Sequence, residues 1–175
     1  MARKTLYFAY GSNMDVSQME RRCPKAKPLS ILTLPNYRLV FRGVADIIPA
    51  HGMSVDGVLW AITDECEFAL DRYEGYRKDA PNGGMYRKET FKLKLPSGAR
   101  DVMFYAMNSG AYSLPYAGYG ECIQRAYKTW KLDMDKFETA IAHAEKSEFA
   151  RHPRNWFDDQ PASRSPKQPA GGYRL

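Results

Sequence analysis

The residues whose types and spacing best suit ligand chemistry are Gly-Ser-Asn at positions 11–13, directly after an apolar run over residues 6–10. An amphipathic segment opens at Asp15, and this order is typical of a buried strand, a tight loop and a helix start. Backbone N–H groups in such a loop, together with the positive end of the helix dipole, can receive a carboxylate or another anion. Gly11 lets the backbone approach a ligand because it has no Cβ. The same residues also occur where a chain only turns, so the loop alone leaves both interpretations open.

Glu74 is the second group of chemical interest. It ends a helix predicted over about residues 64–73, stands directly before Gly75, and has Tyr73 and Tyr76 as neighbours. A carboxylate that aromatic side chains half-enclose can have a raised pKa and can act as a general acid and base. Glutamates at helix ends are mostly solvated surface charges. Glu74 therefore gains meaning only in combination with other residues.

The two segments together resemble the γ-glutamylcyclotransferase family, which includes the plant AIG2-like proteins and the butirosin-biosynthesis cyclotransferase. In that family a strand ends in Tyr-Gly-Ser-Asn, which is similar to residues 10–13, and the catalytic glutamate lies in a Leu-Asp-x-x-Glu-Gly context, which is similar to residues 70–75. Gly-Met-Tyr follows after a loop and is matched by residues 84–86. Two further pocket tyrosines of the family correspond to Tyr105 and Tyr119. The order and spacing agree over most of the domain.

The resemblance implies a reaction as well as a fold. The α-amine of a γ-glutamyl amide attacks its own γ-carbonyl and releases 5-oxoproline with a free amine or amino acid; since the nucleophile is already tethered, no metal, cofactor or enzyme nucleophile is needed. Glu74 would take the proton from the α-amine and deliver it to the leaving nitrogen. The loop between Glu74 and Gly84 looks longer than in the mammalian enzyme, so the amine side of the small-molecule substrate stays unassigned.

The resemblance also implies substrate-binding residues, which are Tyr10, Gly11, Ser12, Asn13, Tyr86, Tyr105 and Tyr119. Backbone amides of residues 11–13 would bind the α-carboxylate or stabilise the developing oxyanion. The tyrosines would line the pocket and donate hydrogen bonds through their hydroxyls. For Tyr105 and Tyr119 the alternative is an ordinary core aromatic, and both interpretations stay open.

Other functions are also open from the residues alone. A serine hydrolase would use Ser12, although the Gly-x-Ser-x-Gly motif is absent around it. A binding module or sensor would hold γ-glutamyl or small carboxylate ligands in the same pocket without turnover, although pure binding has little need for Glu74. A nucleic-acid partner would rely on the net charge of +6. Half of that charge lies in the last 15 residues and the rest is mixed in sign, so we do not expect nucleic-acid binding.

The composition indicates a packed protein with a single domain. The chain has 175 residues, of which 44% are hydrophobic and 13% aromatic. Its three widely separated cysteines and three scattered histidines favour reduced thiols in the cytoplasm over disulfides or a metal site. We expect neither a signal peptide nor a membrane span. The sequence does not indicate the oligomeric state.

Both strands and helices are predicted to position these groups. Apolar, alternating and β-branched segments predict strands over residues 6–10, 36–42, 45–48, 55–62, 86–95 and 101–107. Capping and apolar spacing predict helices over residues 15–22, 64–73, 123–130 and 135–149. The strands over residues 86–95 and 101–107 are predicted to form an antiparallel hairpin.

This arrangement predicts an α+β domain over residues 1–152, built on a curved, largely antiparallel sheet or a small β-barrel flanked by helices. Regular alternation of strands and helices is absent from the pattern. Residues 153–175 are rich in proline and carry basic residues, and we expect them to form a loosely ordered tail.

Overall fold

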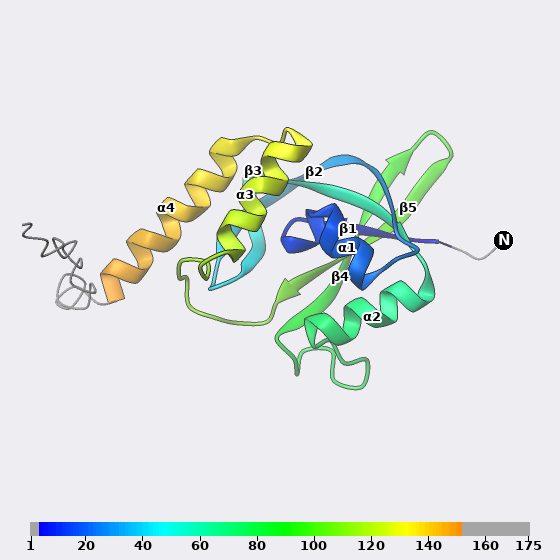
Figure 1. Ribbon diagram of the computed structural model, residues 1–175, viewed down its shortest axis with the longest axis horizontal. Helices are drawn as coiled ribbons and strands as arrows, with labels where there is room; N and C mark the ends of the chain where they lie inside the picture. Colours follow the sequence, from blue (N-terminus) through cyan, green and yellow to red (C-terminus); the bar gives the residue numbers. More distant parts are fainter. Residues whose placement is uncertain (1–3, 152–175) are drawn as a thin grey trace, which may run out of the picture.

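The computed structural model describes residues 4–151, so the segment predicted as a tail lies outside the described residues. The elements in chain order are β1 (Thr5–Ala9), the 3-10 turn η1 (Ser12–Met14), α1 (Val16–Arg22), β2 (Lys27–Phe41), β3 (Ala45–Ile62), α2 (Asp64–Glu74), β4 (Tyr86–Leu95), β5 (Gly98–Met107), α3 (Tyr119–Trp130) and α4 (Met134–Arg151). In Figure 1, α3 and α4 lie together at one end of the molecule, and α2 lies at the other.

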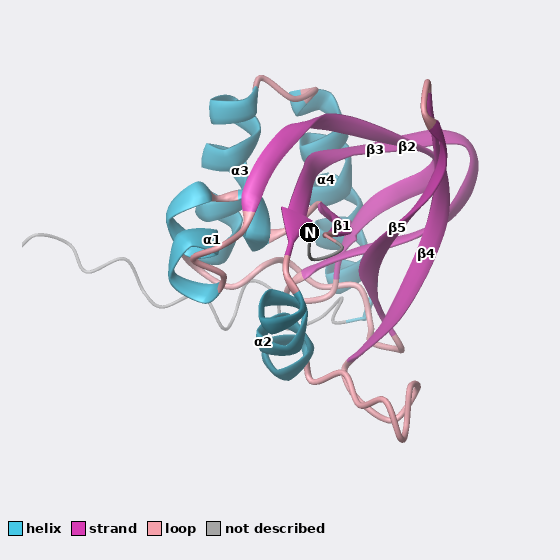
Figure 2. Ribbon diagram, turned by 90° about the vertical axis from the view of Figure 1, so that its right-hand side faces the viewer, coloured by secondary structure: helices cyan, strands magenta, loops and turns pink. Residues whose placement is uncertain are grey.

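The strands form one five-stranded sheet in the order β2-β3-β1-β5-β4. All neighbours pair antiparallel except β1 and β5, which run parallel. Figure 2 shows the strands curving strongly on one side, with α1, α2 and α3 on the other. The predicted α+β class is confirmed, and of the two predicted shapes the structure has the curved open sheet, since β2 and β4 remain its edges.

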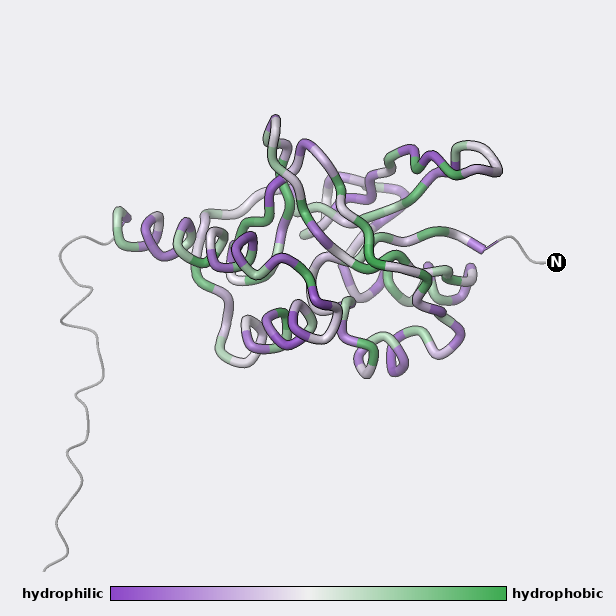
Figure 3. The backbone as a smooth tube through the Cα atoms, turned by 90° about the horizontal axis from the view of Figure 1, so that it is seen from above, coloured by the Kyte–Doolittle hydropathy of each residue, from purple (hydrophilic) through white to green (hydrophobic). Residues whose placement is uncertain are grey.

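The central strand β1 is almost completely buried. Leu6, Tyr7, Phe8 and Ala9 are each no more than 4% exposed, because β3 and β5 flank the strand and helices cover it. In Figure 3 the hydrophobic colour follows the central strands, whereas polar and apolar turns alternate along α4. Over residues 4–151, no helix has both the length and the apolarity that a membrane crossing requires.

The predicted strands over residues 45–48 and 55–62 are wrong in their extent, because both belong to the single strand β3. The intervening Pro-Ala-His-Gly-Met-Ser has the composition of a turn, but its two ends, Pro49 and Ser54, pair with Tyr37 and Pro35 of β2, and the four residues between them lie opposite Asn36. The register shifts between Pro35 and Tyr37, where Asn36 adopts a φ of 61° and its side chain accepts a hydrogen bond from the Gly52 amide at 3.2 Å. A bulge therefore absorbs the residues that looked like a loop.

The strand β2 begins at Lys27, nine residues before the start of the predicted strand at 36. This segment contains Pro28 and Pro35, and proline cannot donate a ladder hydrogen bond. An edge strand tolerates proline, and β2 is an edge. The sheet position that reconciles proline with strand structure could not be seen in the sequence.

Candidate active site

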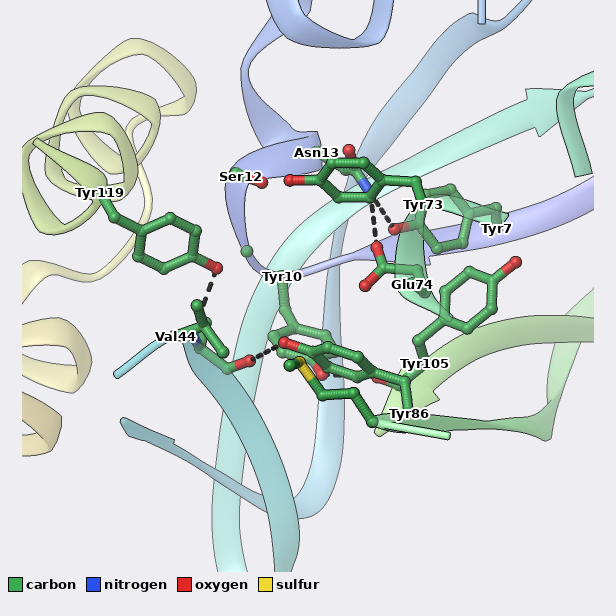
Figure 4. A pocket seen from close by; sticks show the side chains of 13 residues that line it. Tyr7, Tyr10, Ser12, Asn13, Val44, Tyr73, Glu74, Tyr86, Tyr105 and Tyr119 are labelled. Atoms are coloured by element: carbon green, nitrogen blue, oxygen red, sulfur yellow. Dashed lines mark hydrogen bonds between the residues drawn. The ribbon is translucent and has the colours of Figure 1, made fainter. Parts of the chain in front are cut away.

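A pocket of ≈ 230 Å³ opens where β1 ends, next to the end of α2 (Figure 4). Every residue predicted for the site lines it: Tyr10, Gly11, Ser12, Asn13, Glu74, Tyr86, Tyr105 and Tyr119. The lining also contains residues that the sequence did not nominate, namely Tyr7, Val44, Ala45, Tyr73 and Met85. The pocket is therefore assembled from segments spread over more than 100 positions of the chain.

Two glycines bring the end of α2 next to the start of β4. Gly75 ends α2 with a φ of 68°, the left-handed conformation that favours glycine. A Cβ on Gly84 would lie 2.0 Å from the carbonyl oxygen of Gly75, so the chain can cross itself here only without that side chain. Glu74 stands beside one glycine and Tyr86 two residues beyond the other. The crossing thus sets these two side chains on the same pocket.

The loop after β1 folds into the short turn η1. The amide of Met14 donates to the Gly11 carbonyl at 3.0 Å, and the amide of Asp15 donates to the Ser12 carbonyl at 3.1 Å. The side chain of Asp15 caps α1 by accepting from the Gln18 amide at 3.0 Å, so the predicted N-cap is confirmed. Glycine also suits position 11 because an added Cβ would lie 3.2 Å from the Tyr119 hydroxyl.

The surroundings of Ser12 do not suit a serine nucleophile. Its hydroxyl accepts a hydrogen bond from the Arg22 guanidinium at 3.2 Å. Along residues 4–151, no histidine lines the pocket that could take its proton. A hydrolase that depends on a Ser–His pair therefore finds no support in this geometry.

The side chain of Asn13 is fully used inside the protein. Its Nδ2 donates to the Tyr7 hydroxyl at 2.9 Å and to Glu74 Oε1 at 3.2 Å, and its Oδ1 accepts from Arg22 at 2.5 Å. We predicted from the sequence that Asn13 binds substrate. Because the side-chain donors are occupied, such a contact would fall to its backbone amide, while the side chain holds Glu74.

Glu74 is the half-buried carboxyl group of this pocket. Burial raises its pKa to about 7, although the charge of Arg22 and the hydrogen bond from Asn13 oppose that shift. A carboxyl group that titrates near neutral pH can both accept and return a proton under ordinary conditions. The chemistry predicted for Glu74 thus has a physical basis in its surroundings.

Three pocket tyrosines donate their hydroxyl protons to oxygen atoms of the protein. Tyr10 donates to the carbonyl oxygen of Tyr105 at 2.5 Å, and Tyr86 donates to the carbonyl oxygen of Ala45 at 3.3 Å. The hydroxyl of Tyr105 points away from the pocket and donates to Asp71 at 2.6 Å (Figure 4). The rings form part of the pocket wall, but their hydroxyl protons are already used in hydrogen bonds within the protein.

Two further hydroxyls of the pocket, those of Tyr7 and Tyr119, act as acceptors. Tyr7 accepts from Asn13, and Tyr119 accepts from the Ala45 amide at 3.2 Å. A hydroxyl carries one proton and can donate once, so an accepting tyrosine still has its own proton to offer. Burial raises the pKa of Tyr119 to about 12 and that of Tyr7 well above its usual value, so both are neutral donors at pH 7.

Sequence reasoning missed Tyr7 and Arg22, which complete the group around Glu74. A tyrosine within an otherwise apolar strand was a usable signal for Tyr7, because its buried hydroxyl needs a partner. Arg22 gave no such signal, since a basic residue in the last turn of a helix is common on electrostatic grounds alone.

Residues 7–132 match the protein family described as "Gamma-glutamyl cyclotransferase, AIG2-like". A gamma-glutamylcyclotransferase of Bos taurus is 32% identical over 93 residues, which is 46% of this chain and 47% of the relative. One of Homo sapiens is 30% identical over 105 residues, which is 53% of either chain. The chain thus spans about half the length of the curated relatives it matches.

Solved structures show the same fold. A structure entitled "Gamma-glutamyl cyclotransferase" superposes with a TM-score of 0.66 at 24% identity, over 79% of this chain and 86% of that one. An uncharacterized protein from Homo sapiens also gives 0.66, at 25% identity over 78% and 86% of the two chains. YkqA from Bacillus subtilis gives 0.63 at 22% identity, over 83% of this chain and 55% of its own.

Proposed function

The chain belongs to the AIG2-like γ-glutamyl cyclotransferase family, and on that premise we propose that it is an enzyme that converts a γ-glutamyl amide into 5-oxoproline and a free amine or amino acid. The observation that carries the proposal is the Glu74 carboxyl, which has a pKa of about 7 and faces a pocket beside the Gly11–Asn13 loop. We place the reaction in the cytoplasm, which the free thiols of Cys23, Cys66 and Cys122 support.

The proposed reaction needs one group that moves protons in both directions. The Glu74 carboxylate takes a proton from the substrate α-amine as its nitrogen bonds to the γ-carbonyl carbon, which gives a tetrahedral intermediate. The C–N bond to the leaving amine then breaks, its electron pair stays on that nitrogen, and Glu74 returns the proton there. Glu74 ends the cycle in its starting form. A pKa close to the working pH suits both steps.

The remaining lining residues would hold the substrate in its folded-back conformation. Backbone amides of the Gly11–Asn13 loop would receive the α-carboxylate or the developing oxyanion. The spare hydroxyl protons of Tyr7 and Tyr119 would donate to oxygen atoms of the glutamyl group. Holding the α-amine near the γ-carbonyl contributes to the rate because the attack is intramolecular.

The experiment that tests the proposal measures 5-oxoproline release by the purified full-length protein on γ-glutamyl amino acids, γ-glutamylamines and glutathione. The variant Glu74→Gln keeps the shape of the side chain and removes its proton chemistry, so we expect its rate to fall by about 100-fold or more. Glu65→Gln is the matched control, because Glu65 lies on the same helix with a side chain 74% exposed to solvent.

A binding module without turnover remains the second interpretation, and the same experiment separates it. Saturable binding of a γ-glutamyl compound by wild-type protein, without 5-oxoproline from any of these substrates, would favour a sensor or carrier. Wild-type turnover by Glu74→Gln would remove Glu74 from the mechanism.

A further inference from the structure

Arg22, the last residue of α1, contacts the pocket wall from outside. Its guanidinium donates to the Ser12 hydroxyl at 3.2 Å, to Asn13 Oδ1 at 2.5 Å and to the Tyr73 hydroxyl at 2.6 Å. Its central carbon also lies 3.7 Å from the centre of the Tyr73 ring. Arg22 does not itself line the pocket, while the three residues it contacts do. Arg22 can therefore act on a ligand or on Glu74 only through these residues or through its charge.

The contact with Asn13 fixes which way the side-chain amide faces. With Oδ1 bound to the guanidinium, Nδ2 must point toward Tyr7 and Glu74, as it does. A half-turn of the amide would set its oxygen against the Glu74 carboxylate and its NH₂ group against the guanidinium. Both of those contacts are repulsive. Arg22 thus selects the Asn13 orientation that donates to Glu74.

The ionisable side chains around Glu74 come from several of the elements that line the pocket. They are the tyrosines Tyr7, Tyr10, Tyr73, Tyr86, Tyr105 and Tyr119, with Arg22 behind Asn13. Burial raises the pKa of the tyrosines on β1, β4, β5 and α3, so they carry no charge at pH 7. The nearby charges Asp46 and Lys88 are paired with Arg42 and with Asp71 and Glu67, respectively.

We propose that Arg22 is a positioning residue: through the Asn13 amide and its own charge it holds Glu74 in place and favours the carboxylate form. The catalytic meaning of this inference rests on the proposed function. Its structural part, the control of Glu74 by Arg22, does not require that the protein turn over any substrate.

The test compares three variants of the full-length protein. Arg22→Gln removes both the charge and the guanidinium fork, whereas Arg22→Lys keeps the charge and loses the fork. Arg21→Gln is the control, because Arg21 is the adjacent, exposed residue of the same helix end. Thermal unfolding of each variant shows that it folds.

The first readout is the titration of the Glu74 carboxyl by carbon NMR, assigned by the signal that Glu74→Gln lacks. We expect Arg22→Gln to raise the midpoint by about half a pH unit or more, and Arg22→Lys by less. Arg21→Gln should titrate like the wild type. An Arg22→Gln titration that coincides with that of Arg21→Gln would overturn the inference.

The second readout is the rate of 5-oxoproline release. For Arg22→Gln, the acid limb of the kcat/KM profile should shift to higher pH together with the NMR midpoint, and kcat should fall about tenfold. For Arg22→Lys, kcat should also fall, but the acid limb should shift less. A loss of rate in Arg22→Gln without a moved limb would contradict the positioning role. If no variant and no wild-type protein releases 5-oxoproline, the proposed function fails, and the titration still decides whether Arg22 controls Glu74.

Discussion

At the scale of single residues, the pocket tyrosines differ in what their hydroxyls already bind. Tyr105 donates its proton to Asp71, whereas Tyr119 accepts from the Ala45 amide and keeps its proton. The sequence placed both in one class of pocket tyrosine. The hydrogen bonds of the two hydroxyls distinguish the tyrosines, and no pattern in the sequence indicates those hydrogen bonds.

The division predicts unequal effects of removing the two hydroxyls. Tyr119→Phe should lower kcat/KM by about tenfold or more, since it removes a donor to the substrate, while Tyr105→Phe should lower it by no more than about threefold. Steady-state kinetics with one substrate measure both, with thermal unfolding to confirm folding. Equal losses in the two variants would contradict the assignment of free and committed protons.

Glu74 also links stability to pH. Its pKa is raised from 4.5 to about 7 in the folded protein, so the fold favours the protonated form and is destabilised once the group ionises. We expect Glu74→Gln to have a larger free energy of unfolding than the wild type above pH 7, by about 1–3 kcal/mol. The difference should shrink from pH 7 to pH 4.5 and vanish below. Urea unfolding at pH 4 and pH 8 measures it, and an equal difference at both pH values would argue against a buried, perturbed carboxyl.

At the scale of elements, the crossing of Gly75 and Gly84 joins α2 to β4 and thereby sets Glu74 against the pocket. Gly84→Ala would force a Cβ to within 2.0 Å of the Gly75 carbonyl oxygen, so the crossing must open. We expect the rate of 5-oxoproline release to fall by about tenfold or more, with a loss of about 1–3 kcal/mol in stability.

Gly83→Ala is the matched control for this prediction. Gly83 lies in the same exposed loop, and its added Cβ would come no closer than 3.1 Å to the side chain of Ala80. Its kinetics should remain near those of the wild type. If Gly84→Ala behaves like Gly83→Ala, the crossing does not position Glu74.

The predicted elements were most accurate where short-range signals agree. The hairpin of β4 and β5 was predicted, and Tyr86 pairs with Met107 and Leu95 with Gly98 as alternation and the turn require. The early half of β2 and the middle of β3 were missed. Their prolines and glycine predict loops. They belong to strands because β2 is an edge strand and because β3 bulges opposite Asn36. Sheet order is a long-range property that local patterns do not contain.

At the scale of the whole molecule, the pocket is shared by β1, α2, β4, β5 and α3. A ligand that binds there would contact elements far apart in the chain, from Tyr7 to Tyr119, so binding should stabilise the fold as a unit. The product 5-oxoproline at about 100 times its Kd should raise the free energy of unfolding by about 2.7 kcal/mol. A thermal shift titration measures this, and D-lactate, a small carboxylate without the lactam ring, provides the control. No shift with any γ-glutamyl compound or 5-oxoproline would argue against a glutamyl pocket.

The motif residues predicted which side chains meet, because the two segments resemble a known family whose order and spacing they share. The chain alone did not predict that Arg22 would reach Asn13 or that Tyr7 would complete the group. Those contacts depend on how α1 packs beside the end of α2, which follows from the packing of the whole domain.

The pH dependence of kcat/KM for 5-oxoproline release, in the wild type and in Glu74→Gln, tests the role of Glu74 most directly. The carboxylate is the form that accepts the proton, so the wild-type rate should fall as the pH drops below about 7, with one ionisation near the pKa of about 7. Glu74→Gln should be slower by about 100-fold or more and should lack that acid limb. A wild-type rate that stays constant down to pH 5, or a Glu74→Gln profile with the same limb and height, would contradict the proton-transfer role of Glu74.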